Sequence, residues 1–273
     1  MENKLKALFI YLVLVVSAAI TIFPFLWVVL SSLKNRVDVF AIPPKWIFTP
    51  TINNYLTVLQ NSDYVSYLIN SLIISTCAVL ISLVFGSCMA YAFSRFHFAG
   101  KEQLTFFVIT TRMAPPIGFV LSFFILLRSL SLLDNRLGLV IVYIPLNMAF
   151  VVWMMKGFFD EIPSTLDDSA MVDGYTRIGA FIKVILPLCK PGLVATAIFS
   201  YIITWNEFLY AFILTRSASR TLPTLIPQFM GVVELKWETM CAAAILTVLP
   251  VIIFGLLIQK HLVRGLTMGA VKG

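Results

Sequence analysis

The chain alternates long apolar runs with polar connections, and six of the runs are long enough to cross a bilayer. A hydrocarbon core about 30 Å thick is spanned by about 20 helical residues. Because no water is available inside the bilayer, each backbone polar group must pair within its own segment, which favours helices. The pattern predicts an all-α integral membrane protein with six transmembrane helices. We expect them at Ala7–Leu30, Leu68–Phe93, Leu104–Leu127, Gly138–Met155, Gly192–Leu214 and Met240–Gln259.

Prolines interrupt several of these expected spans. Proline lacks the backbone N–H that a helix interior needs, and its ring clashes with the preceding turn. We therefore expect kinks or breaks at Pro24, Pro115, Pro116, Pro145 and Pro250. We find no internal repeat, and residues 1–273 are interpreted as a single transmembrane domain with a polar fourth loop, 156–191, and a polar tail, 260–273.

Composition supports the membrane assignment and excludes several classes of function. Only 12% of residues are charged and the mean hydropathy is +0.95, whereas soluble domains carry roughly 25% charge. The net charge of +7 comes mostly from basic residues at the ends of apolar runs, which indicates membrane anchors rather than a nucleic-acid surface. The four cysteines have no metal or disulfide spacing and both histidines lie outside the runs, so neither a metal site nor an intramembrane hydrolase is expected.

The distribution of Lys and Arg gives a weak orientation signal. Eleven lie in the N-terminus, the second and fourth loops and the tail, eight lie in the other loops, and Arg112 lies within the third span. Because cytoplasmic segments carry the excess of basic residues, we expect both termini and the fourth loop in the cytoplasm.

The fourth loop contains a pattern typical of two short helices. Ser164 and Asp167 have the spacing of a capping box, and Gly174 suits a helix end that needs positive φ. We therefore predict a helix over Thr165–Asp173.

A second helix is expected after Thr176, which can cap it. Its predicted apolar face is Ile178, Phe181, Ile182 and Ile185, and Pro187 and Pro191 are expected to end it. From the residues alone, this loop is either a capped segment on the membrane surface or a docking element.

The stretch "DSAMVDGYTRIGAFIKVILPLCKP" resembles the signature loop of the inner-membrane permease subunits of binding-protein-dependent ABC importers. Four positions depart from the signature: Asp168 replaces Glu, Ser169 replaces Ala, Tyr175 replaces a small residue and Val184 replaces Ile. The resemblance assigns ATPase coupling to this loop, at Asp168, Ser169, Ala170, Asp173, Gly174, Phe181, Leu186 and Pro187, with Pro191 also at a matching spacing.

The resemblance extends over nearly the whole chain. The stretches "FPFLWVVLSSLK", "PPKWIFTPTINNY", "AYAFSRFHFAGK", "WNEFLYAF" and "VRGLTMGAVKG" are similar to the six-span second permease of carbohydrate-uptake systems of the maltose and glycerol-phosphate type. This resemblance implies that the protein lies in a bacterial or archaeal cytoplasmic (inner) membrane. It also implies three kinds of partner: a second homologous permease, two copies of a cytoplasmic ATPase and an extracytoplasmic solute-binding protein.

The same resemblance implies that the chain itself is not an enzyme. The sequence has no G-x-x-x-x-G-K-[ST] loop to hold phosphates, so ATP and Mg²⁺ are expected on the partner ATPase and no cofactor on this chain. Disaccharides, oligosaccharides, polyols and glycerol-phosphate-type ligands all remain open as the transported solute.

Polar side chains within apolar spans are costly and mark candidate solute contacts. One interpretation pairs Arg112 with Glu207; another leaves Arg112 at a bend. Asn147 either bonds the carbonyl that Pro145 frees or faces a polar cavity, and Trp205 either contacts a sugar or belongs to an interfacial belt. The candidate solute path comprises Arg112, Asn147, Trp205, Asn206 and Glu207.

The alternative class is a self-contained secondary carrier or channel for small polar solutes. Such a protein needs an intramembrane ion or proton relay, for which Glu207 is the single acidic candidate in the expected spans.

Overall fold

The computed structural model describes residues 2–230 and 235–267. Across these ranges the chain is helical and has no strand, apart from an isolated antiparallel bridge between Met230 and Leu235. The helices divide into two compact units, Met1–Ser66 with Leu225–Leu249 and Tyr67–Thr224 with Pro250–Gly273.

The first unit is built on a long apolar helix whose most apolar stretch is not covered by this chain. Where that helix ends, Asn54 donates to the carbonyls of Ser32 and Lys34, both at 2.8 Å. The buried Lys34 ammonium lies 4.7 Å from the centre of the Trp27 ring, which offsets part of its desolvation. The helices of this unit are α1 (Glu2–Ser32), α2 (Arg36–Val39), α3 (Asn53–Leu59) and the first parts of α4 (Ser62–Arg95) and α13 (Trp237–Thr267), with the end of η3 (Leu222–Phe229).

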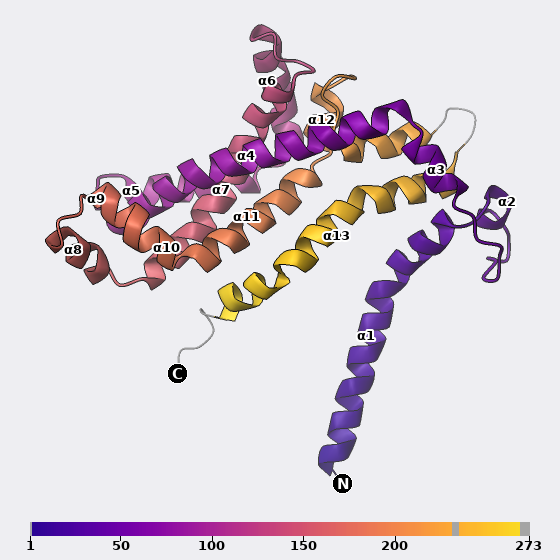
Figure 1. The fold of residues 1–273 in the computed structure, drawn as a ribbon, viewed down its shortest axis with the longest axis horizontal. Helices are drawn as coiled ribbons and strands as arrows, with labels where there is room; N and C mark the ends of the chain where they lie inside the picture. The colour runs from indigo at the N-terminus through magenta and orange to yellow at the C-terminus, as the bar shows by residue number, and fades with distance from the viewer. Residues whose placement is uncertain (1, 231–234, 268–273) are drawn as a thin grey trace. The chain divides into compact units, whose positions relative to one another are not determined.

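The second unit places α4, α7 and α11 alongside one another, with the fourth loop at one end and α12 at the other (Figure 1). Helices α7 and α11 approach closely at Gly192, where a Cβ would lie 2.5 Å from the ring of Phe158. Its further helices are α5 (Lys101–Thr110), η1 (Thr111–Met113), α6 (Ile117–Ser129), α7 (Arg136–Glu161), α8 (Thr165–Val172), α9 (Arg177–Ala180), η2 (Phe181–Ile185), α10 (Leu186–Leu188), α11 (Lys190–Trp205) and α12 (Leu209–Leu214).

Three described helices are individually long and apolar enough to cross a membrane. They are Lys6–Ser32, Ser62–Arg95 and Arg136–Glu161, and they contain the first, second and fourth predicted spans. Pro24 and Pro145 lie inside helices that continue through them, as Pro250 does in α13. The helices are therefore not broken at these three positions, and a kink there stays a prediction.

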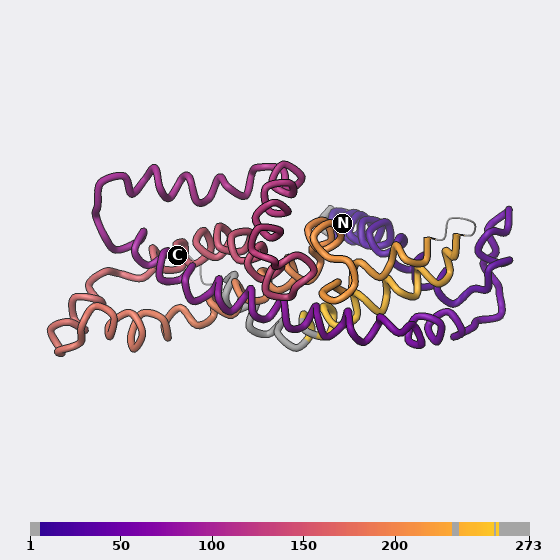
Figure 2. The backbone as a smooth tube through the Cα atoms, turned by 90° about the horizontal axis from the view of Figure 1, so that it is seen from above, coloured from indigo at the N-terminus to yellow at the C-terminus, as the bar shows by residue number. Residues whose placement is uncertain are grey.

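The third predicted span is not one straight helix. Lys101–Met113 and Ile117–Ser129 meet at an angle of 99°, and Figure 2 shows this sharp turn where α5 gives way to α6. Pro115 and Pro116 lie at the break, because two successive residues without a backbone N–H cannot continue the helix.

The fifth predicted span is also corrected. Helix α11 ends at Trp205, and a separate short helix, α12, begins at Leu209. At its other end α11 meets the preceding segment Arg177–Leu188 at 78°. The break falls at Cys189, between the two prolines that were expected to end the loop helix.

The sixth predicted span lies within α13. Among the residues whose burial is described, its apolar part covers Trp237–Ile253. The helix continues to Thr267, so the first part of the predicted polar tail is helical, and residues 268–273 lie outside the described ranges.

Candidate functional site

The first helix of the fourth loop is confirmed, and it ends as predicted. Helix α8 runs to Val172, and Gly174 follows with φ +91°. The Gly174 N–H donates to Met171 and the Tyr175 N–H to Ala170, both at 3.1 Å. These bonds satisfy carbonyls that a helix end leaves free, and they require a backbone conformation that favours glycine.

The second loop helix begins where its capping residue predicts. The Thr176 hydroxyl accepts a hydrogen bond from the Gly179 N–H at 3.1 Å, which caps α9. Phe181 and Ile185 are buried against α4 and α7. Ile178 and Ile182 are exposed, so half of the predicted apolar face is not covered by this chain. The buried face of this segment is therefore narrower than predicted, and its part Phe181–Ile185, η2, is π-helical.

The outward face of α8 combines acidic and apolar groups. Asp168, Ser169 and Asp173 are exposed, and Val172 is 88% exposed. Ala170, on the opposite face, is buried. The residues that the family resemblance assigns to ATPase coupling therefore fall into two groups. Some are exposed and can be reached by a partner, and others are buried and hold the loop in place.

The predicted capping box is wrong. The Ser164 side chain caps nothing in α8, and the Asp167 carboxylate turns instead toward α4. There it accepts hydrogen bonds from Tyr91 Oη at 2.5 Å and Arg95 Nε at 2.8 Å. Sequence reasoning did not identify Tyr91 and Arg95, although their i,i+4 spacing at the end of a span places both on one helix face.

A second site lies at the bend between α5 and α6. It is a cavity of about 460 Å³ that contains both a cation and a carboxylate, Arg112 and Glu207. Its walls are otherwise mostly aromatic and aliphatic. The lining residues are Thr111, Arg112, Ala114, Pro116, Phe119, Phe123, Pro145, Leu146, Ala149, Ile203, Glu207, Leu209 and Tyr210.

Arg112 and Glu207 share this cavity, but among the described residues they do not form the predicted ion pair. The Arg112 guanidinium lies 4.8 Å from the centre of the Phe150 ring. The Glu207 carboxylate accepts from Tyr143 Oη at 2.7 Å and from the N–H groups of Tyr210 and Ala211 at 2.9 and 3.2 Å. Glu207 therefore caps α12 and holds a buried tyrosine.

The other three candidates for the solute path do not line this cavity. Asn147 is buried and donates to the Tyr143 carbonyl and to Thr204 Oγ1, at 2.9 and 2.7 Å, so it does not bond the carbonyl that Pro145 frees. Trp205 is buried against Tyr201, which excludes it from an interfacial belt in this chain. Asn206 is exposed and donates to the Ile202 carbonyl at the end of α11.

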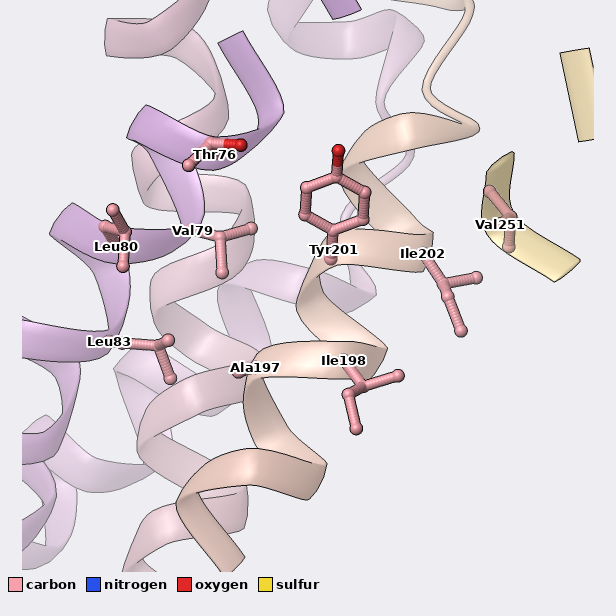
Figure 3. A pocket seen from close by; sticks show the side chains of 9 residues that line it. All are labelled: Thr76, Val79, Leu80, Leu83, Ala197, Ile198, Tyr201, Ile202 and Val251. Atoms are coloured by element: carbon pink, nitrogen blue, oxygen red, sulfur yellow. The ribbon is translucent and has the colours of Figure 1, made fainter. Parts of the chain in front are cut away.

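A further crevice between α4 and α11 is chemically unsuited to a polar solute. Figure 3 shows its walls, where Thr76 and Tyr201 carry the only side-chain hydroxyls. Its volume is about 230 Å³ and the remaining lining residues are aliphatic. A sugar placed there would lose hydrogen bonds to water without replacement. No cluster of three or more metal-ligating side chains occurs within the part of the chain that the structure describes.

Asp134 joins the third and fifth loops at the end of the unit away from α8. It adopts φ +53°, and its carboxylate accepts from the backbone N–H groups of residues 216–219 at 3.0–3.3 Å. Partial burial raises the pKa of this carboxyl, but the four N–H donors outweigh it and lower the pKa to about 2. We call this arrangement the Asp134 clasp.

We expect Asp134→Asn to lower the free energy of unfolding at neutral pH by about 1–2 kcal/mol. The thermal unfolding midpoint should fall accordingly. The folded pKa lies below the ordinary value of 3.8. The stabilisation is therefore complete above pH 3.8 and is lost as the pH falls toward 2. Melting curves of the detergent-solubilised protein should show a constant difference from wild type above pH 4 that shrinks below it. A difference equally large at pH 2.5 and pH 7, or one matched by the exposed control Glu102→Gln, would contradict this origin.

Comparison with known proteins agrees with this architecture. Over 276 residues the chain is 33% identical to the trehalose/maltose transport system permease protein MalG of Thermococcus litoralis, covering 100% of this chain and 99% of that protein. It is 37% identical over 255 residues to the trehalose transport system permease protein SugB of Mycobacterium tuberculosis, covering 92% of each chain.

A solved structure shares the fold. A chain from the crystal structure of a bacterial ABC transporter that imports the acidic polysaccharide alginate superposes with a TM-score of 0.78 at 22% identity, covering 95% of this chain and 97% of that one. Residues 78–268 match the family described as the inner membrane component of binding-protein-dependent transport systems. This chain therefore belongs to that family of membrane transport components.

Proposed function

We propose that the chain is the permease subunit of an ATP-driven ABC importer that passes a sugar or sugar-like solute into the cytoplasm. The observation that carries the proposal is similarity over 92–100% of the chain to permeases named for trehalose and maltose transport. In this proposal a second homologous permease completes the pore, an extracytoplasmic binding protein delivers the solute, and two copies of a separate ATPase bind ATP and Mg²⁺.

The six-span topology belongs to the same proposal. Three single helices, two bent pairs and the shorter apolar helix Trp237–Ile253 are sufficient for six crossings. Broken helices are tolerated at membrane depth where they line a cavity or are covered by protein. Both termini and the fourth loop are then cytoplasmic.

The fourth loop is proposed as the coupling element that contacts the ATPase. Support comes from the outward face of α8, where exposed Asp168 and Asp173 flank an almost fully exposed Val172. Charged rims around apolar anchors are typical of protein interfaces. Ser169, Gly174, Leu186 and Pro187 complete the proposed coupling set, with Ala170 and Phe181 as its buried anchors.

The solute path is proposed to run through the cavity that Arg112 and Glu207 line. Guanidinium and hydroxyl groups can bond sugar hydroxyls, and the Phe119, Phe123 and Tyr210 rings offer apolar faces. A cavity of about 460 Å³ lies within the size range of small-molecule sites. The proposed path no longer needs Asn147, Trp205 or Asn206 as solute contacts, since none of them lines this cavity.

The secondary-carrier alternative has less support. It requires a titrating intramembrane group, and Glu207 is already occupied by one hydroxyl and two backbone donors. A proton or ion relay also needs further charged groups along the path, and Glu207 is the single acidic residue in the expected spans.

Co-purification and uptake together test the function. Affinity-tagged chain, solubilised mildly from its native membrane, is expected to carry a P-loop ATPase and a second permease. After reconstitution, uptake of radiolabelled trehalose or maltose should require both ATP and the binding protein. A chain that purifies alone and transports sugar without ATP would establish the alternative.

Orientation is checked in the same preparation with single cysteines in a cysteine-free background. Ser62→Cys and Ser217→Cys, both at exposed positions, should react with an impermeant thiol reagent in intact cells. Ser169→Cys, on the exposed face of α8, should react only after the membrane is opened. Labelling of Ser169→Cys in intact cells would reverse the proposed topology.

A further inference from the structure

A buried ion pair ties the fourth loop to the end of α4. Asp167 in α8 and Arg95 in α4 are joined at 2.8 Å, with side chains only 11% and 9% exposed. The second carboxylate oxygen accepts from Tyr91, one helical turn before Arg95. We call these three residues the Asp167 latch.

Arg95 and Tyr91 also hold the segments on either side of α8. Arg95 Nη2 donates to the Ile162 carbonyl at 2.8 Å, in the connection from α7. The Tyr91 ring lies 4.5 Å from the Phe181 ring and 5.8 Å from the Phe159 ring, centre to centre. The end of α7, helix α8 and η2 therefore all contact the last turn of α4.

The other end of α4 holds a different set of segments. Asn70 is fully buried, and its amide donates to the carbonyls of Ala218 and Arg220 at 3.1 and 2.9 Å. Its oxygen accepts from Arg136 Nε at 2.7 Å. Asn70 thereby joins the fifth loop, next to the Asp134 clasp, to the first residue of α7.

Helix α4 is unbroken and contains no proline between these two attachments. The 25 residue steps from Asn70 to Arg95 span roughly 37 Å along the helix axis. That length exceeds the hydrocarbon thickness of about 30 Å. One unbroken helix, long enough to cross the bilayer, thus has specific polar attachments near both of its ends.

We propose that Tyr91, Arg95 and Asp167 are positioning residues that make α4 move with the fourth loop, so that α4 carries the loop's displacement to the opposite end of the unit at Asn70. The inference rests on the proposed coupling of that loop to an ATPase. Buried ion pairs often contribute little net stability but fix one geometry. Apolar packing of Phe181 and Ile185 already anchors the loop, whereas the latch adds the directional contact that transmits a rigid-body movement.

The test compares solute transported per ATP hydrolysed in the complete reconstituted importer, with trehalose or maltose as the probe. Arg95→Gln and Asn70→Ala should each lower this ratio about fivefold or more, a coupling change of ordinary allosteric size, while ATP hydrolysis continues. Arg95→Lys, which keeps the charge, should recover part of the ratio. Glu102→Gln, an exposed carboxylate in the first turn of α5, is the matched control and should keep it.

If these residues have only a structural role, a different outcome is expected. The yield of assembled importer then falls, while the importer that does assemble transports as much solute per ATP as wild type. That result in both Arg95→Gln and Asn70→Ala overturns the inference. If neither variant assembles, Tyr91→Phe removes only the hydroxyl and keeps the ring contacts, and an unchanged ratio there likewise overturns it. Failure of the proposed function itself is distinguishable, because then the wild-type chain would show no ATP-dependent uptake.

Discussion

Gly174→Val should abolish most uptake while leaving insertion and subunit assembly intact. Gly174 ends α8 with φ +91°, a conformation that a β-branched residue adopts only at a cost of roughly 1–2 kcal/mol. No atom lies within 4 Å of the position a Cβ would take, so the effect comes from the backbone and not from a clash. Such a cost depopulates the native turn by about five- to thirtyfold and misdirects the exposed face of α8.

The matched control for this prediction is Gly157→Val. Gly157 also has open space around its Cβ position but no positive φ, and it lies inside α7. Uptake and the amount of assembled importer should be measured together for both variants. Normal uptake in Gly174→Val would show that the turn is dispensable, and equal losses in the two variants would assign the effect to added bulk.

Glu207→Ala should severely reduce the yield of folded chain, whereas Glu207→Gln should be mild. Alanine leaves the buried Tyr143 hydroxyl and two N–H groups of α12 without their acceptor, at about 1–3 kcal/mol for each unsatisfied buried group. Glutamine keeps an acceptor oxygen near the same donors. Yield of monodisperse protein and its melting midpoint in detergent measure this difference.

The same pair of variants distinguishes the cap from an ion pair with Arg112. If Glu207 neutralised Arg112, the glutamine variant would leave the Arg112 charge without its partner and would be nearly as damaging as alanine. Arg112→Gln provides the reciprocal control. On the proposed path it should keep normal yield and lose uptake, and a loss of yield equal to that of Glu207→Ala would restore the ion-pair interpretation.

Local chemistry made much of the fourth loop predictable. The glycine that ends α8 and the threonine that caps α9 act on groups within a few residues of themselves, so spacing alone identifies them. The apolar runs likewise predicted the helical class. The prolines predicted a kink or break where the 99° bend lies, at Pro115 and Pro116. Hydropathy shows how many apolar residues follow one another but not where a helix ends within them, which is why it did not predict the end of α11 at Trp205.

Contacts between distant segments were the other source of error. Asp167 was interpreted by its neighbours in sequence, but its partners Tyr91 and Arg95 lie more than 70 residues earlier. One interpretation paired Glu207 with the distant Arg112, whereas two of its three donors lie only three and four residues ahead. An acidic residue just before a short apolar helix is itself a capping signal, and it could have identified this role.

The Asp134 clasp fixes the backbone path of the fifth loop without depending on which side chains the loop carries. Its carboxylate holds the backbone N–H groups of residues 216–219, and every residue except proline supplies such a group. The exposed side chains of Arg216, Ser217 and Ala218 can therefore diverge while the loop keeps its path. Substitutions at these positions can therefore change the charge and size of this surface to suit a new partner while the backbone of the loop stays the same.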